Sequence, residues 1–155
     1  GHFYVVGNTY GGLDGNTNAG NDDLFVVKYN NNGVKQWTQQ LGTSNIERAH
    51  AITSDSSDNV YVTGLTGAVL DGRGHYGGQD LFVVKYNSNG VKQWTRQFGT
   101  LSAEVGYGIT SDSSGNVYVT GYTGGSLDGN KNTGNTINQD YDIFVVKYDT
   151  NGNRQ

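Results

Sequence analysis

A stretch of ten residues that occurs twice constrains the fold of this chain more than any other feature. Residues 55–64 read DSSDNVYVTG, residues 112–121 read DSSGNVYVTG, and a related stretch, GHFYVVG, opens the chain. The two full copies lie 57 residues apart, and Trp37 recurs as Trp94 at the same spacing. A period of this length indicates tandem repeats of one supersecondary unit, so the repeat is the frame for every other inference.

Each copy consists of four short runs rich in β-branched and aromatic residues, which suit a strand. Typical runs are AHAITSD, VYVTG, DLFVVKYN and VKQWTQQLG. None is long enough or periodic enough for a helix of normal length. Phe82 follows Phe25 by 57 residues but Phe144 follows Phe82 by 62, so the third copy carries five extra residues. We expect strands at 4–7, 23–29, 34–41, 49–54, 60–64, 80–86, 91–98, 106–111, 117–121 and 142–148.

The joints between the runs carry turn residues. Asn32-Gly33 and Asn89-Gly90 separate the third and fourth runs, and Asn-Gly is the preferred pair of a type I′ hairpin turn. SSDN and SSGN join the first and second runs in the same way. Four antiparallel strands with tight turns, repeated in tandem, predict an all-β fold of four-stranded β-propeller blades. The apolar run FVVKY fits a strand that neighbouring blades cover on both faces, so two sets of repeat-equivalent residues are expected to be buried between blades: Phe25, Phe82 and Phe144, and Val27, Val84 and Val146.

Four phrases carry a resemblance to a known family: GNVYVTGYT, DLFVVKYNSNG, QWTRQFGT and GYGITSDSSGN. They resemble the bacterial β-propeller repeat family called SBBP. The resemblance covers the whole chain and is specific, because the four phrases recur in order at blade spacing. It implies a propeller in a surface or exported bacterial protein, with no established chemistry, and it makes the first run the innermost strand and the fourth run the outermost.

The repeat divides the chain into three units. Residues 1–57 are expected to hold the first blade without its inner strand, together with the inner strand of the second blade. Residues 58–114 complete the second blade and add the inner strand of the third, and residues 115–155 form a third blade that lacks its outer strand. Because propellers close with roughly 4–8 blades, we interpret the chain as part of a larger propeller, with self-assembly of copies as the alternative.

The composition argues against several classes of function. Only 15% of the residues are charged and the net charge is −4, which disfavours binding to a nucleic-acid backbone. No apolar run reaches the length of about 18 residues that a membrane span needs, and the absence of cysteine excludes disulfides and thiolate metal sites. His2, His50 and His75 occupy three different repeat positions, and no GxSxG motif is present. These features indicate a protein that is not an enzyme, unless further blades supply an active site.

The loops between the second and third runs are the candidate metal sites. Oxygen-bearing side chains alternate there, as in loops that wrap Ca²⁺. The same residue types also form turns in which Asp and Asn bond the loop's own backbone, and this turn is the favoured interpretation. The second copy has Arg73 and His75 in place of two asparagines, which predicts no calcium there. The candidate calcium ligands are Asp14, Asn16, Asn18, Asp23, Asp128, Asn130, Asn132 and Asp142, with Asp22 and Asp140 beside them.

Repeated aspartates and loop tyrosines complete the candidates. Asp23, Asp80 and Asp142 are expected to anchor the third run by accepting backbone N–H bonds, and Asp55 and Asp112 to form Asx turns. The function we expect is a scaffold, adhesion or interaction module at the cell surface, whose partner is a protein or a glycan. Lectin-like glycan binding is the alternative, because exposed aromatics with Asn and Asp can form sugar platforms. The tyrosines in or beside loops are Tyr10, Tyr76, Tyr107 and Tyr122, whereas Trp37 and Trp94 are expected to pack.

Overall fold

The computed structural model describes residues 1–70, 72, 74–133 and 140–155. These residues form ten β-strands, and none of them lies in a helix. Within the same ranges, no helix has the length and apolar character needed to cross a membrane. The strands are β1 (His2–Thr9), β2 (Asp23–Asn30), β3 (Lys35–Leu41), β4 (Glu47–Ser54), β5 (Val60–Thr66), β6 (Asp80–Tyr86), β7 (Lys92–Phe98), β8 (Glu104–Ser111), β9 (Val117–Thr123) and β10 (Asp142–Tyr148).

The ten predicted strands are confirmed, but several run further than their sequence pattern indicated. β4 begins at Glu47 and β5 ends at Thr66, because these two residues pair with each other beyond the glycine of the VTG phrase. The third copy repeats this extension, where Glu104 pairs with Thr123. Both extensions follow a β-bulge, at Ala49/Ala51 and Gly106/Gly108, and the bulge lets the strands keep pairing past the glycine.

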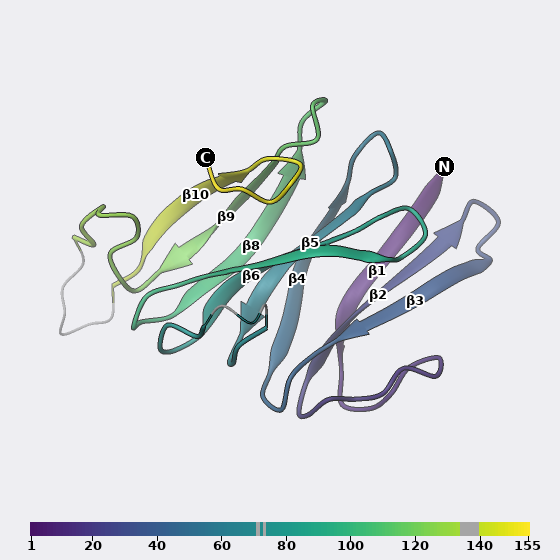
Figure 1. Cartoon of the computed structure of the whole chain (residues 1–155), viewed down its shortest axis with the longest axis horizontal. Helices are drawn as coiled ribbons and strands as arrows, with labels where there is room; N and C mark the ends of the chain where they lie inside the picture. Colours follow the sequence, from purple (N-terminus) through teal and green to yellow (C-terminus); the bar gives the residue numbers. More distant parts are fainter. Residues whose placement is uncertain (71, 73, 134–139) are drawn as a thin grey trace.

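Three antiparallel sheets lie side by side, and each follows the order of the chain (Figure 1). The first sheet is β1-β2-β3, the second is β4-β5-β6-β7, and the third is β8-β9-β10. The inner strand β4 contacts β1 and β2 on one side and β8 on the other. The all-β fold of propeller-type repeats is therefore confirmed, whereas the division of the chain into units after residues 57 and 114 stays a prediction.

The hairpin turns differ from the predicted type. In the β2–β3 turn only Gly33 has a positive φ, at 73°, whereas a type I′ turn needs a positive φ at two residues. Gly33 N donates to Asn30 O, and Asn30 N donates to Val34 O, both at 3.0 Å. This pattern is a three-residue loop in which a glycine in the left-handed region follows a tight turn. The type I′ prediction is wrong because the Asn30 side chain holds the turn, accepting Val34 N at 2.9 Å.

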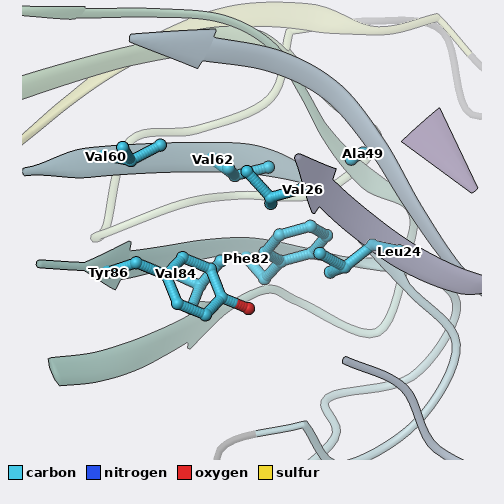
Figure 2. Packing of buried hydrophobic residues seen from close by; sticks show 8 residues of the cluster. All are labelled: Leu24, Val26, Ala49, Val60, Val62, Phe82, Val84 and Tyr86. Atoms are coloured by element: carbon cyan, nitrogen blue, oxygen red, sulfur yellow. The ribbon is translucent and has the colours of Figure 1, made fainter. Parts of the chain in front are cut away.

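The apolar core lies between the sheets. One cluster joins the first and second sheets and contains Leu24, Val26, Val62, Phe82 and Val84. Figure 2 shows the Phe82 ring between Leu24 of β2 and Val84 of its own strand. A second cluster joins the second and third sheets and includes Tyr61, Leu81, Val83, Val119 and Val146. The second sheet is thus covered on both faces.

The repeat-equivalent phenylalanines do not share one environment. Phe82 is fully buried, as predicted, but Phe25 and Phe144 are only half-buried. Leu24 and Val26 of β2 face the second sheet, so Phe25, which lies between them, is on the opposite face of the strand. Phe144 lies on β10, the last strand of a three-stranded sheet. The equivalent valines Val27, Val84 and Val146 are all buried, so this part of the prediction is confirmed.

Candidate functional site

The first acidic loop is closed by hydrogen bonds and one ion pair. Asp14 adopts a φ of 51°, its Oδ1 lies 2.6 Å from Lys35 Nζ, and its Oδ2 accepts a hydrogen bond from Thr38 Oγ1 at 2.5 Å. The hydrogen bonds from Lys35 and from Thr38 hold the pKa of Asp14 below its usual value. Asn16 Nδ2 donates to Leu13 O at 2.8 Å. The Asp14 carboxylate is therefore already neutralised by a cationic side chain.

The rest of this loop also bonds to the protein itself. Asn18 Nδ2 donates to Tyr10 O at 2.9 Å and to Gly20 O at 2.8 Å. Asp23 Oδ2 accepts Ala19 N at 2.8 Å and Gln40 Nε2 at 2.9 Å. These contacts are those of the turn interpretation, in which Asp and Asn side chains satisfy the loop backbone.

The loop of the third copy repeats the pattern in the part that the structure describes. Asp128 has a φ of 50°, and its Oδ1 lies 2.6 Å from Arg154 Nη2. The backbone of Asn130 donates to Leu127 O at 2.8 Å. Asn132 Nδ2 donates to Thr123 O at 3.3 Å, and Asp142 Oδ2 accepts Thr133 N at 3.1 Å.

The calcium hypothesis for these loops stays a prediction. Over residues 1–70, 72, 74–133 and 140–155, no three His, Asp or Glu side chains form a group that could hold a metal ion. A cation at Asp14 or Asp128 would have to displace Lys35 or Arg154 from its carboxylate. Arg73, on which the expected difference of the second copy depended, lies outside the described residues.

The repeated aspartates before the FVVKY run each accept a backbone N–H, as the sequence predicted. The donors are Ala19 for Asp23, Tyr76 for Asp80 and Thr133 for Asp142. Each bond ties the preceding loop to the start of a strand, so the role of these oxygens is structural.

Asp55 and Asp112 form the predicted Asx turns. Asp112 Oδ1 accepts Ser114 N and Asn116 N, both at 2.9 Å, and Asp55 does the same one repeat earlier. The hydrogen bond from the Asn116 side chain, with those from the backbone, holds the pKa of Asp112 low. Burial opposes the shift at Asp55, but bonds from Asn59 and its neighbours still hold the pKa below its usual value.

A row of aromatic rings crosses the second and third sheets. His50 and Tyr107 occupy equivalent positions at the β-bulges of β4 and β8, and their rings stack at 4.9 Å. Tyr107 contacts Tyr122 at 5.6 Å, and Tyr122 contacts Tyr141 at 4.4 Å. His50 Nδ1 lies 3.0 Å from Gly106 O, which orients the imidazole. Tyr107 and Tyr141 are about half exposed, at 55% and 48%.

The aromatic row is specific to one place in the repeat array. The second copy has Leu65 where the third has Tyr122, and Gln79 where the third has Tyr141. A bulge re-aims the side chain that it carries, and this explains why His50 and Tyr107 face each other from neighbouring sheets. Sequence analysis singled out Tyr107 and Tyr122 but did not place them together, and it missed His50 and Tyr141 as ring partners.

The two tryptophans pack between sheets, as expected. Trp37 of β3 contacts Tyr86 of the second sheet at 6.4 Å and donates its Nε1 proton to Ser88 O. Trp94 makes the same contacts to the third sheet, with Tyr148 at 6.4 Å and with Thr150 O. Each tryptophan therefore joins the outer strand of one sheet to a hairpin of the next.

Sequence analysis did not identify two buried glutamates as candidate functional residues. Glu47 and Glu104 are the only glutamates of the chain, they are repeat-equivalent, and both are fully buried. The sequence does contain a sign of their importance: the two glutamates lie 57 residues apart, one repeat length, and each begins a strand.

Comparisons with known proteins agree with the fold. The model of the family described as SBBP, beta-propeller repeat, matches residues 36–71 and 93–128. An uncharacterized WD repeat-containing protein, L264, of Acanthamoeba polyphaga mimivirus is 28% identical over 88% of this chain. The regulatory protein FlaEY of Caulobacter vibrioides is 25% identical over the whole chain. The chain spans 12% of the length of the viral protein and 18% of that of the bacterial one.

Proposed function

The chain carries SBBP beta-propeller repeats, and from this premise we propose that it is a non-catalytic interaction scaffold of a bacterial surface or exported protein. Repeat propellers present extended surfaces on rigid blades, and loops on such a scaffold are where contacts to other molecules usually form. The name of the viral relative supports a repeat scaffold and says nothing of a ligand.

The observation that carries the scaffold proposal is an apolar face at each end of the array. Ile143 and Val145 of β10 are 88% and 72% exposed. Their equivalents in β6, Leu81 and Val83, are fully buried under the third sheet. The chain thus displays at its surface the residues with which one blade of this repeat binds the next.

The other end of the array presents the complementary face. Phe3 and Val5 of β1 are 47% and 43% exposed, whereas the equivalent Val60 and Val62 are fully buried against the first sheet. The partner that fits either end is therefore a sheet of the same repeat type, which supports assembly with further blades. We propose adhesion at the cell surface as the role of such an assembly.

Sedimentation velocity tests the scaffold proposal. The chain should associate as its concentration rises, and Val145→Asp should abolish the association because it places a charge on the apolar face. Tyr10→Ser is the matched control, since Tyr10 is 76% exposed and lies beyond the end of β1. A chain that stays monomeric at all concentrations, or whose association ignores Val145→Asp, would contradict the proposed use of this face.

Location at the surface needs its own test. An antibody raised against the chain should label intact cells of the source bacterium, with lysed cells as the control for antibody recognition. Labelling that requires lysis would contradict a surface location.

Glycan binding is the second candidate, and the aromatic row supports it. Sugar rings stack on exposed aromatic faces, and Tyr107 and Tyr141 offer two such faces within one row. A glycan array should show binding that Tyr107→Ser and Tyr141→Ser abolish and Tyr10→Ser retains. Binding that survives both tyrosine changes, or no binding to any glycan, would remove this candidate.

A further inference from the structure

The two glutamates of the chain are buried where one sheet meets the next. Glu47 and Glu104 are 0% exposed. Oε1 of Glu47 accepts hydrogen bonds from Thr43 Oγ1 and Thr66 Oγ1 at 2.8 Å, and Oε2 accepts Thr43 N at 2.6 Å. Thr100 and Thr123 surround Glu104 in the same way. All of these donors are neutral, so they orient the carboxylates without balancing their charge.

A buried aspartate from the preceding sheet lies at each of these junctions. Asp23 of β2 is 1% exposed, and Asp80 of β6 is 0% exposed. In each aspartate Oδ2 is satisfied by a backbone N–H and a glutamine amide, from Gln40 or Gln97. Oδ1 of each aspartate is buried and has no hydrogen-bond partner within the described part of the chain. One oxygen of each aspartate is thus left free to bind something else.

The free aspartate oxygen faces the buried glutamate across a glycine. A Cβ built on Gly99 would lie 2.1 Å from Asp80 Oδ1 and 3.0 Å from Glu104 Oε2. Both oxygens therefore border the same small space, which a side chain at this position would fill. At the first junction a Cβ on Gly42 would lie 2.0 Å from Asp23 Oδ1, and its three nearest atoms all belong to Asp23. Asp23 and Glu47 are paired here as the repeat equivalents of Asp80 and Glu104.

The charges at these junctions need a counter-ion. At the first junction Arg48 pairs with Asp22, at 2.8 Å, and no ion pair within the described residues reaches Asp23 or Glu47. At the second junction His75 Nδ1 lies 3.2 Å from Asp80 Oδ2, the oxygen that already accepts two hydrogen bonds. Burying a carboxylate without an opposite charge is strongly unfavourable. Two buried carboxylates that share one space also repel each other.

We propose that each carboxylate pair, Asp23 with Glu47 and Asp80 with Glu104, binds one Ca²⁺ ion that bridges adjacent blades. Carboxylate oxygens are the ligands that Ca²⁺ takes, with backbone carbonyls and waters completing its shell of roughly six to eight oxygens. A divalent ion balances both charges of a pair, whereas one shared proton balances only one. This site is distinct from the exposed loops, where Lys35 and Arg154 already neutralise Asp14 and Asp128.

Calcium content and thermal stability test this proposal on the intact chain. After dialysis against CaCl₂ and desalting, mass spectrometry of the metal should find two Ca²⁺ per chain, and EDTA should lower the melting temperature by several degrees. Asp80→Asn should bind one ion, and the double variant Asp23→Asn/Asp80→Asn should bind none and lose the response to EDTA.

Two control variants separate this site from its alternatives. Asp142→Asn changes the equivalent aspartate of the third sheet, which meets no glutamate of this chain, and it should keep both ions. Asp14→Asn changes the exposed loop and should also keep both. Loss of an ion in Asp14→Asn would overturn the proposal and place the cation in the loop.

Other results would contradict calcium binding at the carboxylate pairs. A wild-type chain that retains no Ca²⁺ and melts at the same temperature with CaCl₂, MgCl₂ and EDTA would overturn the proposal. Stabilisation by acidification alone, without any response to Ca²⁺, would show that the pair shares a proton instead. If the double variant does not fold by far-UV circular dichroism, the wild-type stoichiometry and the single variant Asp80→Asn decide the question.

Discussion

The second and third sheets are built from nearly the same residues, yet their FVVKY strands differ sharply in exposure. All five residues from Asp80 to Val84 of β6 are buried, whereas β10 alternates between exposed and covered positions. Ile143 and Val145 occupy the places of Leu81 and Val83 but face solvent. The difference lies in the neighbour, because β6 has a sheet on each face and β10 has one. The comparison shows that this repeat encodes a strand for the interior of a stack.

The largest effect is expected at the centre of the first interface. Phe82→Ala should cost about 3–5 kcal/mol of unfolding free energy, because Phe82 is fully buried and its loss leaves a cavity. Phe144→Ala should cost clearly less, since the half-buried Phe144 already contacts water on one side. Urea unfolding of both variants measures the difference, and equal losses would contradict the unequal covering of the two sheets.

The next largest effect is expected on the opposite faces of β6 and β10, where Leu81 is buried and the equivalent Ile143 is exposed. Leu81→Ala should cost about 2–5 kcal/mol, the range for a buried leucine. Ile143→Ala should change stability by no more than about 0.5 kcal/mol, as expected for an exposed site. The pair should be measured at low protein concentration by chemical denaturation. A large loss in Ile143→Ala under these conditions would mean that something covers this face.

A smaller effect is expected at the glycine of the VTG phrase. A Cβ on Gly64 would lie 1.8 Å from the backbone oxygen of Arg48, so Gly64→Ala forces the inner strand to move and should cost about 1–3 kcal/mol. Gly7 is the equivalent in the first sheet, which has no inner strand, and its Cβ would meet only the Phe25 ring. Gly7→Ala should therefore be milder in thermal unfolding. Equal costs would show that the bulged inner strand is not what requires glycine.

The smallest effect concerns the Asx turns, which do not depend on a neighbouring sheet. The pKa values of Asp55 and Asp112 are held low in the folded chain, so their ionised forms stabilise the fold above the unfolded pKa of about 3.9. This stability should be lost as the pH falls through the lower, folded pKa values. Urea midpoints between pH 7 and pH 3 measure it. Asp55→Asn and Asp112→Asn should weaken the acid dependence to a similar extent, and a change confined to one of them would contradict a purely local role.

Sequence analysis predicted the strands well because their signals are local. Runs such as VYVTG and FVVKY carry strand propensity, and the turn residues between them mark where each run ends. It overestimated the burial of Phe25 and Phe144, because repeat equivalence says nothing about whether a neighbour is present at the ends of the array. It chose the wrong turn type because the Asn30 side chain, and not the Asn-Gly pair alone, decides the backbone path.

The candidate sites were harder to predict because they join residues of different sheets. His50 meets Tyr107 only because two bulges re-aim these side chains toward each other. Asp80 meets Glu104 only where the second sheet packs on the third, and neither residue has a local motif that indicates a partner. The spacing of the two glutamates at one repeat length was the available signal.

Thiol labelling tests the central claim, the unequal covering of equivalent strands, most directly. The chain has no cysteine, so Val83→Cys and Val145→Cys each introduce a single probe into the same strand position of the second and third sheets. Val83 is 0% exposed and Val145 is 72% exposed. With a thiol-specific reagent at low protein concentration, Cys at position 145 should react nearly as fast as in the unfolded chain, whereas Cys at position 83 should react only through unfolding. Similar rates at the two positions would contradict the account.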